Sequence, residues 1–200
     1  LASVLFLGVL GPVAYQLSQT RDQYQQLASQ TALKEFAEES APYLCLIPGL
    51  RGTDTEPEVN SGIRLLEKYG LLDRRSFESQ LAACDEADRT RYRHAVFLHV
   101  VEVANLETRR LAAARLRGRE DEIVLERVDQ LVDAATWLQI ETPSRALLFL
   151  RAKQEQLGGN AAASKRRLTE AQRTEPSNPS EIYLEAKRLI ADYQFPEASA

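Results

Sequence analysis

The chain has 200 residues, of which 44% are hydrophobic and 27% are charged, and its formal net charge is −4. This composition is normal for a globular protein, so it excludes a wholly disordered chain and a membrane protein with many spans. The slight acidic excess gives no general affinity for nucleic acid, and the length fits one domain plus a tether.

The amino-terminal segment is apolar. Its sequence LASVLFLGVLGPVAY contains no charge, and the first charged residue of the chain is Arg21. A membrane-spanning helix needs about 20 apolar residues, with a lower limit of about 17. We therefore predict a membrane anchor at residues 1–17. The alternatives are the apolar core of a signal peptide and a buried core helix, but a core helix normally has a polar face and this segment has none.

The chain begins with Leu1 and contains no methionine. We therefore expect either a start that processing has removed or a piece of a longer polypeptide. If the chain is a piece of a longer polypeptide, residues before Leu1 would complete the apolar span. Any catalytic activity would then reside in a further domain.

The segment after the anchor is poor in basic side chains. Cytoplasmic flanks of membrane helices are enriched in Lys and Arg, whereas residues 16–34 contain only Arg21 and Lys34. We therefore expect the body of this single-pass membrane protein to lie outside the cytoplasm, in a bacterial periplasm or at the cell surface. An oxidising compartment would favour a disulfide between Cys45 and Cys84; the alternative is two buried free thiols.

A long helix is predicted to continue from the anchor, because residues 13–40 contain neither Pro nor Gly. Pro42 ends it, so residues 1–46 form an anchor and a stalk together. Apolar residues recur along the stalk at spacings of 7, 3, 6 and 3, a loose stripe suited to packing on a partner. These candidate partner-binding residues are Leu17, Tyr24, Leu27, Leu33 and Phe36.

A hydrophobic start that continues into a long helix resembles the type IV pilins and their minor relatives. The resemblance covers residues 1–40 and implies a filament subunit. Pilins carry a glutamate near the start of the processed helix, whereas this chain has Leu5 there. The rest of the chain also lacks the strand-rich pattern of a pilin head.

Residues 47–62 hold three glycines and two prolines, and this composition predicts a linker. Residues 63–195 form the body. There the apolar periodicity and the capping residues predict antiparallel helical hairpins, and no segment shows the sustained alternation of a strand. The fold class is therefore all-α. The predicted helices cover residues 63–69, 76–86, 88–117, 121–139, 143–157, 160–174 and 179–194, with N-caps at Ser61, Asp88, Thr142, Asn160 and Asn178.

The carboxyl-terminal residues 143–194 resemble a tetratricopeptide (TPR) repeat. Gly159-Asn160 stands where that family has its tight turn, and the segment from Glu175 to Pro179 resembles its inter-repeat turn. Ala152, Leu168 and Ala171 match packing positions. Glu155 and Ser164 depart from the pattern, where an aromatic residue and alanine are usual, and Trp137 leaves no clear repeat upstream. The resemblance implies a TPR-like body that binds other proteins.

No motif in the sequence specifies a reaction, so we expect neither an enzyme nor a bound cofactor or metal. His94 and His99 are five residues apart on one helix, a poor spacing for shared ligation, and His99 with Glu102 lacks a second copy of the pair. We interpret Asp85, Glu86 and Asp88 as a helix junction. Lys165, Arg166 and Arg167 are interpreted as a solvated helix face, and Trp137 as a core residue.

The sequence thus favours a membrane-anchored structural or scaffold subunit. Its expected partners are other membrane or extracytoplasmic proteins, including copies of itself, and the membrane through residues 1–17. Two alternatives remain. One is the carboxyl-terminal tail of a larger membrane enzyme similar to the O-antigen ligases, which can end in a last membrane helix followed by TPR-like helices. The other is the pilin-like filament subunit.

Overall fold

The computed structural model describes residues 2–44, 56–118, 122–139, 144–176 and 178–194. The regular structure in these ranges is entirely helical, which confirms the all-α prediction. The helices are α1 (Ala2–Leu44), α2 (Glu56–Lys68), α3 (Arg74–Ala82), α4 (Glu86–Leu116), α5 (Glu122–Leu138), α6 (Arg145–Leu157), α7 (Ala161–Arg173) and α8 (Pro179–Gln194).

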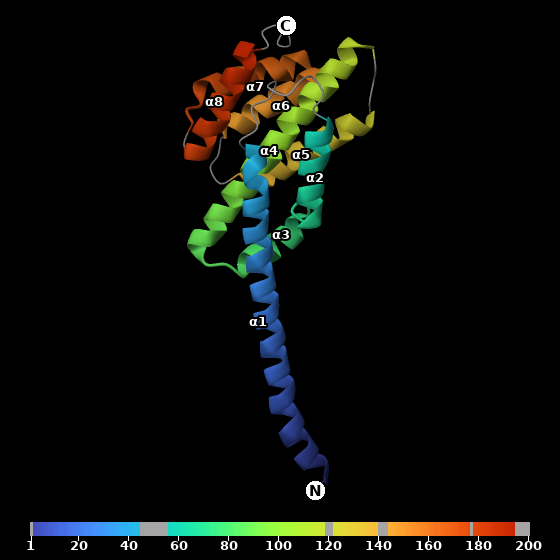
Figure 1. Ribbon diagram of the computed structural model, residues 1–200, viewed down its shortest axis with the longest axis vertical. Coiled ribbons are helices and arrows are strands. Elements are labelled where there is room, and N and C mark those ends of the chain that lie inside the picture. The colour runs from blue at the N-terminus through green and yellow to red at the C-terminus, as the bar shows by residue number, and fades with distance from the viewer. Residues whose placement is uncertain (1, 45–55, 119–121, 140–143, 177, 195–200) are drawn as a thin grey trace.

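Helix α1 extends away from the rest of the molecule, and we call its projecting part the rod. Figure 1 shows α2 to α8 gathered into one body, with the carboxyl-terminal part of α1 against it and the amino-terminal part extending far beyond it. The two parts of α1 therefore have different surroundings. At 1.5 Å per residue, the part before Ser29 is about 40 Å long.

Helix α4 is the centre of the body, and it packs against α1, α2, α3, α5, α6 and α8. Residues 99–104 of α4 are all buried, which leaves no solvent-facing stripe along the middle of the helix. A helix buried all round is typical of the interior of a larger helical domain. Two antiparallel hairpins, α4–α5 and α6–α7, confirm the predicted hairpin arrangement.

The carboxyl-terminal part of α1 belongs to the same hydrophobic core as α2 to α5. Leu33 and Phe36 are fully buried there, and the Phe36 ring meets the Tyr69 ring edge-on with their centroids 5.9 Å apart. Gln30 Nε2 donates to the Ala83 carbonyl at 2.6 Å, which ties the rod to the end of α3. The core therefore does not follow the predicted division between a stalk at 1–46 and a separate body.

The predicted linker at 47–62 is wrong over its second half, because α2 begins at Glu56. Residues 47–55 lie outside the described residues. Pro57 is tolerated because it lies in the first turn of the helix. The carboxylates of Glu56 and Glu58 interact favourably with the positive, amino-terminal end of the helix dipole. Gly62 does not break the helix, since it lies where α2 approaches α4 closely: a Cβ there would be 2.6 Å from Val103 Cγ2.

The predicted caps are partly confirmed. Asn160 accepts from the Ala163 amide at 3.2 Å, and Asn178 accepts from the Glu181 amide at 3.0 Å, so both begin helices as expected. Helix α4 starts earlier than predicted, because Asp85 rather than Asp88 is its N-cap. Thr142 and Pro143 lie outside the described residues, and Ser144 caps α6.

Within the described part of the chain, no helix combines the length and the apolarity that a bilayer crossing requires. The side chains of α1 are described from Tyr15 onward. The anchor predicted at 1–17 falls almost entirely before that residue, so it stays a prediction.

Replacing Gly62 with alanine tests the close approach of α2 and α4. Alanine favours a helix over glycine by about 1 kcal/mol, but the added methyl group would overlap Val103, and overpacking costs about 1–3 kcal/mol. We expect Gly62→Ala to lower the free energy of unfolding, measured by urea denaturation.

The double variant Gly62→Ala/Val103→Ala removes the overlap and should recover part of the loss. Gly158→Ala is the matched control, because a Cβ there meets its nearest atoms at an ordinary 3.5 Å. A Gly62→Ala protein more stable than its parent would contradict the close approach.

Candidate functional site

The rod carries large apolar side chains that the chain itself does not cover. Leu17, Tyr24 and Leu27 are 66%, 70% and 60% exposed, and we call these three residues the rod surface. The sequence grouped them with Leu33 and Phe36 as candidate partner-binding residues. That grouping needs correction, because Leu33 and Phe36 pack into the chain's own core and are inaccessible to a partner.

The rod surface and the buried face of α1 point in opposite directions. At 100° per residue, Leu17 and Leu33 are about 160° apart around the helix axis, and Leu27 and Phe36 are about 180° apart. Between Leu17 and Phe36 the large apolar residues of α1 therefore form two groups: Leu33 and Phe36 face the body, and Leu17, Tyr24 and Leu27 face away from it. Tyr15, which is 63% exposed, stands at the helical angle of Leu33.

Three hydroxyl side chains of the rod are satisfied within the helix. The hydroxyls of Ser18, Thr20 and Thr31 each donate at 2.8 Å to a carbonyl three or four residues earlier in α1. Such bonds let a helix carry hydroxyl residues without a partner outside it. These three hydroxyls therefore need no partner outside the helix.

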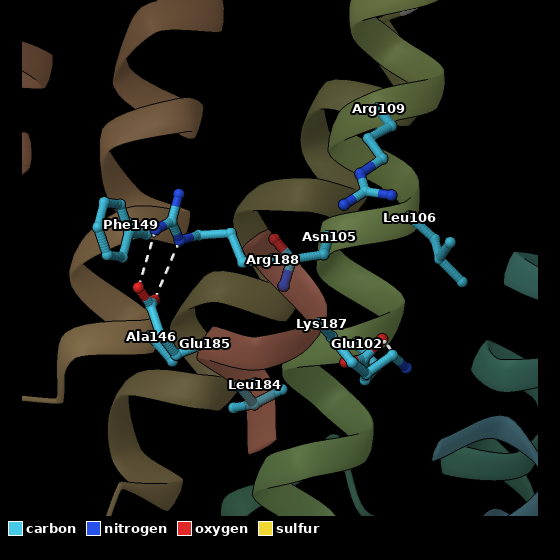
Figure 2. Close-up of a pocket in the computed structure, with 10 residues that line it drawn as sticks. All are labelled: Glu102, Asn105, Leu106, Arg109, Ala146, Phe149, Leu184, Glu185, Lys187 and Arg188. Atoms are coloured by element: carbon cyan, nitrogen blue, oxygen red, sulfur yellow. Dashed lines mark hydrogen bonds and ion pairs between the residues drawn. The ribbon is translucent and has the colours of Figure 1, made fainter. Parts of the chain in front are cut away.

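A cleft lies where α4, α6 and α8 meet (Figure 2). Helix α4 contributes Glu102, Asn105, Leu106 and Arg109, α6 contributes Ala146 and Phe149, and α8 contributes Leu184, Glu185, Lys187 and Arg188. Three of these residues are cationic and two are carboxylates, so the lining has one excess positive charge.

A buried ion pair closes one side of this cleft. Lys187 Nζ lies 2.8 Å from Glu102 Oε2, and the two side chains are 10% and 9% exposed. Burial raises the pKa of Glu102, and the nearby Lys187 ammonium offsets only part of this rise by favouring the carboxylate. The pair fixes α8 against α4, because either charge alone would be buried without its counterion.

On the other side of the cleft, the Arg188 side chain lies over the aromatic ring of Phe149. The Arg188 guanidinium lies 4.2 Å from the Phe149 ring centroid and bonds Glu185 at 2.8 Å, as Figure 2 shows. Arg145 reaches the same carboxylate at 3.2 Å. The hydrogen bond from Arg188 is the main reason that the pKa of Glu185 is lowered. Four of the five charged lining residues are thus engaged in ion pairs with one another, and the rod surface is the stronger candidate site.

His99 and Glu102 do not converge on a common ligand. His99 is fully buried, and its Nε2 lies 3.2 Å from the Gly62 carbonyl. Because a carbonyl only accepts, Nε2 carries the proton. The ring also meets Phe36 edge-on with their centroids 5.3 Å apart. Burial lowers the pKa of His99 to about 4, so the imidazole is neutral at pH 7. Among the described residues, no group of three or more His, Cys, Asp or Glu side chains is arranged to hold a metal ion.

Most of the other residues singled out in the sequence lie in the described part of the structure. Cys84 is buried, and burial raises the pKa of its thiol; Cys45 lies outside the described residues, so the disulfide stays a prediction. Trp137 packs against Phe77 with ring centroids 5.7 Å apart. Asp85 caps α4, which agrees with the interpretation of the acidic cluster as a helix junction.

The segment whose sequence resembles a TPR repeat contains the packed hairpin of α6 and α7. Ala152, Ser164 and Ala171 are buried, and Gly159 has the positive φ of 80° that the turn needs. Leu168, expected at a large packing position, is 37% exposed. Glu155, which replaces the usual aromatic residue, pairs with Arg167 at 3.6 Å.

The sequence did not reveal the Glu102–Lys187 pair or the cleft beside it. The two residues are far apart in the chain, and each has the ordinary character of a charged helix residue. The only available signal was that Glu102 follows Val100 and Val101 within an apolar run. No protein-family model matches this chain, and no curated protein or solved structure gives a significant match.

The buried His99 should make stability depend on pH. Its folded pKa of about 4 lies below the unfolded value of 6.5, so the unfolded chain binds more protons between these values. The free energy of unfolding therefore falls as the pH falls from 6.5 to 4, by up to about 3 kcal/mol from this residue. His99→Gln keeps a donor for the Gly62 carbonyl and removes the titration. Urea denaturation at pH 7 and pH 4.5 should show a smaller loss for His99→Gln than for the parent, and equal losses would contradict the assignment.

Breaking the Glu102–Lys187 pair should destabilise the fold. Lys187→Met leaves the Glu102 carboxylate buried, and we expect a loss of about 3 kcal/mol, as for other broken buried pairs. The double variant Glu102→Met/Lys187→Met removes both charges and should be much closer to the parent in thermal and urea unfolding. A single variant as stable as the double variant would show that the pair does not hold α8.

Proposed function

We propose that this protein is a membrane-tethered scaffold subunit that binds partner proteins in a membrane-associated assembly. The observation that carries the proposal is the rod surface: Leu17, Tyr24 and Leu27 are exposed on a helix that leaves the body. Large apolar side chains gathered on one exposed face typically mark an interaction site.

The charge-free sequence before the rod supports the tether. Residues 1–17 contain no Asp, Glu, Lys or Arg, and the rod continues directly from them as one helix, α1. In this arrangement the rod separates the body from the bilayer. The TPR-like hairpin of α6 and α7 supports a body that offers further surface to other proteins.

Membrane fractionation tests the tether. The full chain should stay with membranes after alkaline carbonate extraction, whereas Leu7→Lys/Leu10→Lys should move most of the protein to the soluble fraction. Each lysine near the centre of a membrane helix opposes insertion by about 3 kcal/mol. Gln16→Lys/Gln19→Lys adds the same charge nearer the end of the segment and is the control. A parent chain found in the soluble fraction would refute the tether.

A photo-reactive amino acid at Tyr24 tests partner binding in the same membranes. A discrete cross-linked product is expected at Tyr24 and should be much weaker at Asp22. The absence of any product at Tyr24 would count against a binding role for the rod surface.

A further inference from the structure

The rod surface is part of a regular repeat. Along α1, Leu17, Thr20, Tyr24, Leu27 and Thr31 follow one another at alternating spacings of 3 and 4 residues. In the sequence, Leu10 and Val13 stand at the preceding positions of the same repeat. This is the a and d pattern of a coiled coil, in which a narrow seam faces one partner helix. We call residues 17, 20, 24, 27 and 31 the seam.

The seam ends where the rod meets the body. The next position of the repeat is Lys34, which is exposed and charged. Leu33 and Phe36 lie on the opposite face of α1 and enter the core. Four of the five seam residues, from Leu17 to Leu27, therefore belong to the part of α1 that projects, and a second helix can approach the seam from the side opposite Leu33 and Phe36.

From these features we infer that two copies of this chain pair through their seams as a parallel coiled coil. This inference rests on the proposed tether, because copies held in one membrane have their rods side by side and pointing the same way. A shared membrane also raises the local concentration of the chains, which favours a short coiled coil.

The charges beside the seam do not oppose the pairing of two copies. The positions that flank the seam are Gln16, Gln23 and Gln30 on one side and Arg21 and Ala28 on the other. In a parallel pair, Arg21 of one copy lies near Gln16 of the other, so no like charges meet across the seam. Charged flanking residues help to set the choice of partner and its orientation, and Arg21 is the only charge at these five positions.

Cysteine cross-linking in membranes tests the inference. Thr20→Cys and Leu27→Cys place a thiol in the seam, whereas Gln19→Cys and Gln26→Cys place one outside it on the same exposed rod. All four are made in the full chain with Cys45→Ser and Cys84→Ala, after circular dichroism shows that this background folds like the parent. We expect a product of twice the chain mass, at least about fivefold stronger for the two seam positions, and loss of the Thr20→Cys product when Leu17→Glu and Tyr24→Glu are added.

Equal cross-linking at all four positions, or none at any, would overturn the pairing. A cross-linked product with another protein's mass would also overturn it but would leave the proposed scaffold function standing. A seam-specific dimer of a chain that does not fractionate with membranes would support the pairing and refute the tether.

Discussion

The structure depends on the burial of the middle of α4, because three ionisable side chains are enclosed there with the apolar ones. His99 is met by the Gly62 carbonyl of α2, Glu102 by Lys187 of α8, and Glu107 by Arg127 of α5 at 3.1 Å. Each buried polar group requires a partner. The partners named here come from α2, α8 and α5, so these contacts help to specify which helix covers which side of α4.

The two faces of α1 connect this core to the proposed function. Near its carboxyl end, Leu33 and Phe36 complete the core. Leu17, Tyr24 and Leu27 lie on the other face and are exposed, so they add little to the packing of a single chain. A helix that contributes to the core at one end can hold its other end in a fixed direction relative to the body, which suits a rigid spacer between a bilayer and a protein-binding surface.

Local chemistry in the sequence was sufficient for part of the fold. The caps at Asn160 and Asn178 were predictable because a side chain and an amide three residues later decide them. The start of α2 was not predictable from the sequence, because Pro57 and Gly62 are typical of a loop. Only the structure shows that Gly62 lies where α2 approaches Val103 closely. Spacing placed the apolar residues of α1 on a helix, but only the body determines that Phe36 turns inward while Tyr24 stays exposed.

The Glu102–Lys187 pair also bears on how the chain tolerates truncation. In many helical-repeat proteins the last helix is a cap that shields the array and contributes mainly local contacts. Here α8 supplies the counterion of a carboxylate inside the central helix. Loss of α8 would therefore remove the ion-pair partner of Glu102 and uncover this carboxylate of the central helix, so shortening the chain at this end changes the charge and the solvation of the body as well as its packing.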